Sequence, residues 1–148
     1  FCEIHYAETT IVPIGIKNSY PTEINFTLLE ARVTQMKEEL FKIINKEIDS
    51  YYYNLAIEVC KEVGARKAST PMVLMGRFES LRPGYYGSLG LNIICDTLIK
   101  LFIYPNILIF NITYLKKPMD YLQEVLVPEA ALRLISQDRE GISLEDAR

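Results

Sequence analysis

Hydrophobic residues recur every three or four positions along most of the chain, which is the spacing of one face of an α-helix. The longest stripe predicts a helix from about Phe26 to Glu47, and charged residues fill most of the positions between its apolar ones. The apolar positions of this stripe are Phe26, Leu29, Val33, Met36, Leu40, Ile43 and Ile44. We therefore expect a core built from helix faces.

Breakers and capping residues delimit two further helices in the first half of the chain. Residues 1–12 are expected to form a short helix that stops before Pro13, because proline interrupts the helical hydrogen-bond ladder. Asp49 or Ser50 is expected to cap the next helix, which ends near Gly64.

The second half predicts three more helices. Ser69 or Thr70 precedes a proline and is expected to start one of them. Ser88 is expected to cap the next, and Pro118 to open the last, which Pro128 kinks or restarts.

Residues 103–115 depart from the helical pattern, because they are rich in isoleucine and aromatic residues and carry no charge. The run is too short to span a membrane. It predicts either a strand-like insert packed on the helices or an exposed, aggregation-prone segment. The expected fold is all-α: a single orthogonal bundle of five to six helices with one apolar irregular insert at about 103–117.

Composition fits a globular domain. The chain has 148 residues, the usual size of one domain, and 49% of them are hydrophobic, enough to form a core. A net charge of −3 gives no global basic field that would recruit nucleic acid or an acidic membrane.

Three cysteines, Cys2, Cys60 and Cys95, do not form a disulfide framework, and the last two fall on apolar helix faces. This usage is typical of a reducing compartment, cytosol or nucleus.

Both ends of the chain suggest a fragment of a longer protein. It begins at Phe1 rather than at methionine, and Ser143 and Asp146 fit a loosened capping box that starts a new helix. We expect residues 1–148 to form one helical domain of that longer protein.

One pair of residues has the spacing of half a zinc site. Cys2 and His5 form a C-x-x-H pair, but zinc prefers four nitrogen or sulfur ligands, and His5 is the only histidine. A complete site would need ligands from upstream, and the alternative is a frayed amphipathic terminus.

A glycine- and tyrosine-rich loop covers residues 83–90. It lacks the lysine and the spacing of a nucleotide-binding loop. It is therefore either a tight turn whose tyrosines pack into the core or an exposed tyrosine platform for a partner. The residues predicted to bind a partner are Arg77, Arg82, Gly84, Tyr85, Tyr86, Gly87 and Gly90.

Basic residues cluster in the segment 61–82, which carries five of them against Glu62 and Glu79 and is therefore locally +3. Such a patch beside tyrosines can hold phosphate or stack bases, although charge runs are usually solvated helix faces. The basic residues are Lys61, Arg66, Lys67, Arg77 and Arg82, of which the first three are the phosphate or nucleic-acid candidates.

Catalytic residues are hard to assemble from this sequence, because any arrangement that needs histidine would have to use His5. Glu79 and Asp96 are the acids expected to be semi-buried, and either could pair with Arg77 or Lys100. A hydrolase or transferase would need a pocket that joins Glu79, Asp96 and a tyrosine. We expect no enzymatic activity.

Several segments taken together resemble one known family. The strongest are Pro71–Glu79, Pro83–Gly87, Tyr121–Ile135 and Ile142–Arg148, supported by Phe1–His5 and the Tyr20-Pro21 step. Nearly the whole chain resembles the C-terminal domain of the fungal restriction of telomere capping protein 4 family. The apolar run at 103–115 departs from the polar loop usual in that family.

The resemblance implies a fungal protein of the nucleus and cytoplasm, with a genetic link to telomere capping and no assigned activity. Members often carry cysteine pairs upstream of the C-x-x-H pair, which implies zinc in the intact protein. Within this fragment we expect no cofactor.

Two functions follow as hypotheses. The first is an interaction or adaptor domain that binds a protein through the Arg77–Gly90 region, and the alternative is phosphate or nucleic-acid binding through the basic cluster. No membrane association is expected, and the oligomeric state stays open.

Overall fold

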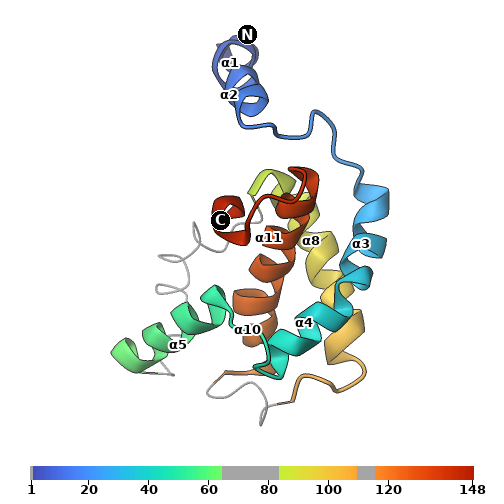
Figure 1. The fold of residues 1–148 in the computed structure, drawn as a ribbon, viewed down its shortest axis with the longest axis vertical. Helices are drawn as coiled ribbons and strands as arrows, with labels where there is room; N and C mark the ends of the chain where they lie inside the picture. The colour runs from blue at the N-terminus through green and yellow to red at the C-terminus, as the bar shows by residue number, and fades with distance from the viewer. Residues whose placement is uncertain (1, 65–83, 110–115) are drawn as a thin grey trace.

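The computed structural model describes residues 2–64, 84–109 and 116–148, with only the backbone of Cys2 (Figure 1). These residues form helices and connecting segments, with no strand among them, so the all-α prediction is confirmed. The predicted helix that starts at Ser69 or Thr70 lies outside the described residues.

The N-terminal helix runs further than predicted. It comprises α1 (Cys2–Tyr6), the π-helical turn η1 (Ala7–Ile11) and α2 (Val12–Lys17), so the predicted stop before Pro13 is wrong. A π turn has a wider ring than an α turn, and this one ends at Ile11, two residues before the proline. It therefore gives the proline ring room that the α ladder would deny it.

The predicted Phe26–Glu47 helix buries the face that the sequence indicates, but its backbone is divided into shorter helical segments. Its parts are the 3-10 turn η2 (Phe26–Leu28), α3 (Leu29–Gln35) and α4 (Lys37–Ile44), with the division at Met36. There the backbone N–H of Met36 donates to the carbonyl of Val33, a tighter turn than the α-helix makes. The buried stripe is Leu29, Val33, Met36, Leu40, Ile43 and Ile44.

Helix α5 (Tyr51–Val63) has the predicted ends. The Ser50 side chain accepts a hydrogen bond from the backbone N–H of Tyr53 at 3.1 Å, so Ser50 is the cap. Gly64 follows the helix with a φ of +81°, a conformation that favours glycine.

A long apolar helix crosses the core next. It comprises η4 (Gly84–Tyr86), α8 (Gly87–Leu98) and η5 (Ile99–Ile103), and it contacts α3 and α11. The predicted cap at Ser88 is wrong, because the 3-10 turn already leads into the helix and Ser88 lies within its first turn.

Among the described helices, only Gly84–Ile103 is long and apolar enough to cross a membrane by length and composition. Its Ile94, Leu98 and Phe102 are fully buried in the core.

The central helix opens at Pro118 as predicted and continues through Pro128 to Asp138. Its parts are α10 (Pro118–Tyr121), the π turn η6 (Leu122–Leu126) and α11 (Val127–Asp138). Of the predicted kink or restart at Pro128, the restart is absent because the helix continues, and a π turn again precedes the proline. Residues 127–134 are all buried, and Figure 1 shows α11 between the other helices.

A last short helix, α12 (Leu144–Ala147), begins at Ser143. The Ser143 side chain accepts a hydrogen bond from the backbone N–H of Asp146, as the capping box predicts.

The apolar insert is only partly within the described residues. Residues 104–106 form a turn after η5, and Leu108 is buried against the core. The described part of this insert packs on the helices through a turn and not through a strand.

Candidate interaction groove

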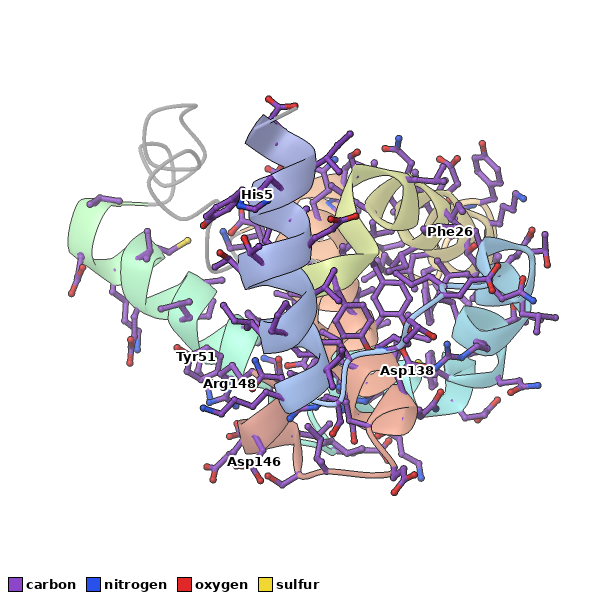
Figure 2. All side chains as sticks on the ribbon, turned by 90° about the horizontal axis from the view of Figure 1, so that it is seen from above. His5, Phe26, Tyr51, Asp138, Asp146 and Arg148 are labelled. Atoms are coloured by element: carbon purple, nitrogen blue, oxygen red, sulfur yellow. The ribbon has the colours of Figure 1, made fainter. Side chains whose placement is uncertain are left out.

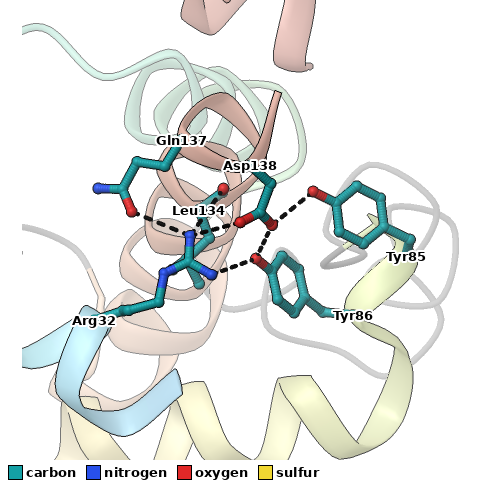
Figure 3. A network of polar contacts seen from close by, with 6 residues as sticks. All are labelled: Arg32, Tyr85, Tyr86, Leu134, Gln137 and Asp138. Atoms are coloured by element: carbon teal, nitrogen blue, oxygen red, sulfur yellow. Dashed lines mark hydrogen bonds and ion pairs between the residues drawn. The ribbon is translucent and has the colours of Figure 1, made fainter. Parts of the chain in front are cut away.

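A polar network joins the start of η4 to the end of α11 (Figure 3). The Arg32 guanidinium donates to Asp138 Oδ1 at 2.8 Å and to the Tyr86 hydroxyl at 3.2 Å. The Tyr85 hydroxyl donates to Asp138 Oδ2 at 2.8 Å, and the Tyr86 hydroxyl donates to the same oxygen. Asp138 therefore holds both tyrosines of the glycine-tyrosine loop.

Arg32 also satisfies the end of the helix that carries Asp138. Its Nη2 donates to the Leu134 carbonyl at 3.3 Å and to Gln137 Oε1 at 3.1 Å. A carboxylate near a helix C-terminus is unfavourable, because the carbonyls there carry partial negative charge. The guanidinium compensates by contacting the carboxylate and a carbonyl together.

Burial changes the acidity of this network. Burial, followed by the hydrogen bond to Asp138 and its charge, raises the pKa of both Tyr85 and Tyr86 well above the usual range. The pKa of Arg32 is also raised: partial burial alone would lower it, but Tyr86 and Asp138 outweigh that effect. The two hydroxyls thus stay protonated as donors.

This geometry divides the predicted partner-binding residues. Tyr86 is 2% exposed, and a Cβ added at Gly90 would lie 2.6 Å from the Tyr86 Cβ. Neither residue presents a surface, so their prediction as partner contacts is corrected to a packing role. Gly84 and Gly87 are exposed with positive φ, and Tyr85 is half-buried.

A groove of about 420 Å³ lies beside this network, between α11, α12 and η4. Its floor is apolar and consists of Pro128, Ala131, Leu132 and Ile135 of α11. The tyrosines that line it are Tyr20, Tyr52 and Tyr85. The rings of Tyr20 and Tyr85 contact each other with centroids 5.3 Å apart.

Two arginines line the groove without an ion pair to any described carboxylate. The Arg139 guanidinium lies 5.7 Å from the Tyr20 ring centroid, and the Arg148 guanidinium lies 3.7 Å from that of Tyr51. Figure 2 shows Arg148 and Tyr51 from above. Arg139 Nε is buried and has no hydrogen-bond partner among the described residues.

Asp146, the one acid among the described residues that line the groove, already has a hydrogen-bond partner. Asp146 accepts a hydrogen bond from the Ser143 hydroxyl at 2.6 Å, within its own capping box. The groove therefore combines an apolar floor with tyrosine rings and guanidinium charge that no described carboxylate pairs, which suits an acidic ligand with apolar side chains.

The family model of the RTC4-like domain matches residues 45–148. The chain belongs to the RTC4-like domain family. No curated protein and no solved structure gave a match. The matched part contains α5 to α12 and both groove arginines, whereas Tyr20 and the N-terminal helix precede it.

The predicted basic cluster of this RTC4-like domain is only partly described. Lys61 is exposed on α5. Four other residues, Arg66, Lys67, Arg77 and Arg82, lie outside the described residues, so the nucleic-acid prediction stays a prediction.

The predicted half zinc site is likewise not decided. His5 is exposed on α1, and the side chain of Cys2 is outside the described part. Within the described residues, no group of three or more His, Cys, Asp or Glu side chains has an arrangement that could hold a metal. The expected site needs upstream ligands and stays a prediction.

The acids that the RTC4-like domain buries differ from those predicted. Asp96 is exposed, and Lys100 pairs with Glu30 at 3.1 Å, so the prediction of a semi-buried Asp96 is wrong. Helix α8 turns that position to solvent although most of the helix is apolar. Glu79 lies outside the described residues.

Two buried ion pairs were missed by sequence reasoning. Glu129 accepts from Arg133 and from the Ser50 hydroxyl, and Lys116 lies 2.8 Å from Glu124. Glu39 adds an oxygen 2.9 Å from Arg133 Nε, a contact whose angle does not make a hydrogen bond. The four-residue spacing of Glu129 and Arg133 on a helix was the available signal.

Proposed function

We propose that this RTC4-like domain is a non-catalytic interaction domain whose groove binds an acidic, partly apolar segment of another protein. The observation that carries the proposal is the Arg139 guanidinium, which lines the groove and makes no ion pair or hydrogen bond with a described residue. The nuclear and cytoplasmic location and the link to telomere capping that the resemblance implies belong to the same proposal.

The unpaired guanidinium favours a carboxylate. The terminal nitrogens of Arg139 make no hydrogen bond with a described residue, so they can donate to a ligand in the groove. A carboxylate is a better acceptor than a neutral carbonyl, because hydrogen bonds between charged groups are stronger and a guanidinium matches a carboxylate in two places. Arg148 at the same groove adds a second positive charge.

The rest of the groove supports a peptide. The floor on α11 can bury an apolar side chain, and tyrosines lose little side-chain entropy when they contact a partner. Asp138 fixes Tyr85 through its hydroxyl, so this wall is ordered before the ligand arrives. The volume falls in the range of sites that hold a ligand of a few side chains.

Nucleic acid is the alternative occupant, because phosphates also suit arginines and bases stack on tyrosines. The net charge of −3 opposes a polyanion at long range, so we favour an acidic segment whose few charges meet the two arginines locally.

An array of twelve-residue peptides tests the proposal. One set is acidic and contains leucine and phenylalanine, and two further sets, one basic and one neutral, are equally apolar. Single-stranded oligonucleotides form a fourth set. We expect only the acidic set to bind and the binding to fall about tenfold or more in Arg139→Glu. Lys42→Glu, which changes the net charge equally at an exposed residue outside the groove, serves as the control.

Backbone NMR shifts on titration locate the bound peptide. We expect the largest changes at residues 84–85, 131–139 and 146–148. Binding of the oligonucleotides alone, or equal weakening by both substitutions, would contradict the proposal.

A further inference from the structure

The N-terminal helix, Cys2–Lys17, stands apart at one end of the molecule and is joined to α3 by a linker (Figure 1). Its described side chains contribute nothing to the core. It exposes six large apolar side chains: Ile4, Tyr6, Ile11, Val12, Ile14 and Ile16, of which Ile4 and Ile16 are 66% and 68% exposed.

Such a helix is not stable by itself. An isolated helix of this length is marginal in water even with alanine-rich sequences, and β-branched residues such as isoleucine and valine are poorer helix formers. Most helical stability in proteins comes from packing an apolar face. This helix exposes apolar surface, and no described neighbour buries it.

The charges along the helix indicate which partner fits. Glu3 and Glu8 lie in its first half, and Lys17 is its basic residue in the last turn. Beside a parallel copy, the glutamates of the two helices would face each other. Beside an antiparallel copy, Glu3 of each helix lies at the Lys17 end of the other, Glu8 lies near the middle, and the helix dipoles also oppose.

We propose that this helix pairs with the same helix of a second copy, antiparallel, to form a symmetric dimer. A two-fold axis makes every contact occur twice, so a weak contact counts doubly. One pair of helices of this length buries less area than a standard interface, so we expect a weak dimer.

Sedimentation velocity of the 148-residue chain over a concentration series tests the proposal. We expect a monomer–dimer equilibrium that Ile11→Asp weakens about tenfold or more. Leu89→Asp is the matched control, because Leu89 is an equally exposed apolar residue on α8, 54% exposed, and should leave the equilibrium unchanged. Circular dichroism checks that both variants keep the helical bundle, to which the N-terminal helix contributes no buried residue.

A charge exchange tests the orientation. Glu3→Lys alone should weaken the dimer, because it faces Lys17 of the second copy, and Glu3→Lys with Lys17→Glu should restore it. A monomer at all concentrations, a dimer insensitive to Ile11→Asp, or a double variant no stronger than the single one would each overturn the proposal.

Discussion

Single side chains stabilise this domain through charges buried in its interior. Glu129 and Arg133 are almost fully buried, and they are linked through Ser50 to the cap of α5 and through Glu39 to α4. A buried charge is tolerated only when its partners remain, so these residues should be sensitive to change one at a time.

Breaking this pair should be costly, and removing both charges should cost less. Arg133→Met should lower the free energy of unfolding by about 3–5 kcal/mol, because Glu129 keeps a buried charge without its cation. Adding Glu129→Leu to that variant should recover part of the loss. Urea denaturation of the two single variants and the double variant measures the coupling, and strictly additive losses would contradict it.

The two tyrosines of the network predict the response to alkaline pH. Their pKa is raised in the folded state, so the folded protein retains protons that the unfolded chain releases from about pH 10 upward. Stability should be level up to about pH 9 and then fall. Tyr85→Phe and Tyr86→Phe should each reduce the loss of unfolding free energy between pH 8 and 11, measured by urea denaturation. A loss in the double variant as steep as in the parent would contradict this cause.

Residue-level prediction from sequence succeeded for apolar positions and failed for charges. The stripe of Leu29, Val33 and Leu40 follows from local spacing, which determines which face is buried. Arg32 and Asp138 are 106 positions apart, so no local pattern indicates that they meet. Asp96 was misjudged because a mostly apolar helix does not specify which of its sides faces solvent.

At the level of elements, prolines interrupt helices less than the sequence rule expects. Pro13 and Pro128 each lie at the second position of an α-helical segment, directly after a π turn. The rule considers only the α ladder, in which proline removes a hydrogen bond and clashes with a preceding carbonyl. The end of α5 and the start of α10 were predicted well because their signals are local.

At Gly90, substitution by alanine should change stability in the direction opposite to the one that helix propensity predicts. Glycine to alanine inside a helix normally stabilises by about 0.5–1 kcal/mol. At Gly90 the new Cβ would lie 2.6 Å from the Tyr86 Cβ, so Gly90→Ala should destabilise by about 1–3 kcal/mol through overpacking.

Gly15→Ala is the control for Gly90→Ala, because its Cβ meets only ordinary contact with Tyr20 at 3.9 Å. Gly15 lies on the N-terminal helix, which contributes no residue to the core, so thermal denaturation of the bundle should show little change for Gly15→Ala. A Gly90→Ala variant as stable as the parent would contradict the close packing of η4 on α8.

At the level of the whole molecule, the fold class and the family could be recognised from the sequence, and the groove could not. Its walls come from residues as far apart as Tyr20 and Arg148, which only the folded chain brings together. Among the described residues, Gly84 and Tyr85 are shared between the predicted partner-binding residues and the groove lining. Gly84 and Gly87 of that loop have positive φ, so the glycines in this segment serve the backbone conformation of the turn as well as any binding.

The affinity of one peptide for one variant tests the central claim most directly. An acidic peptide selected on the parent domain should bind Arg139→Gln about tenfold or more weakly by fluorescence polarisation, because the peptide carboxylate loses its guanidinium partner. The Lys42→Gln variant should bind it as the parent does. Equal affinity of the parent and Arg139→Gln would contradict the assignment of this groove as the binding site.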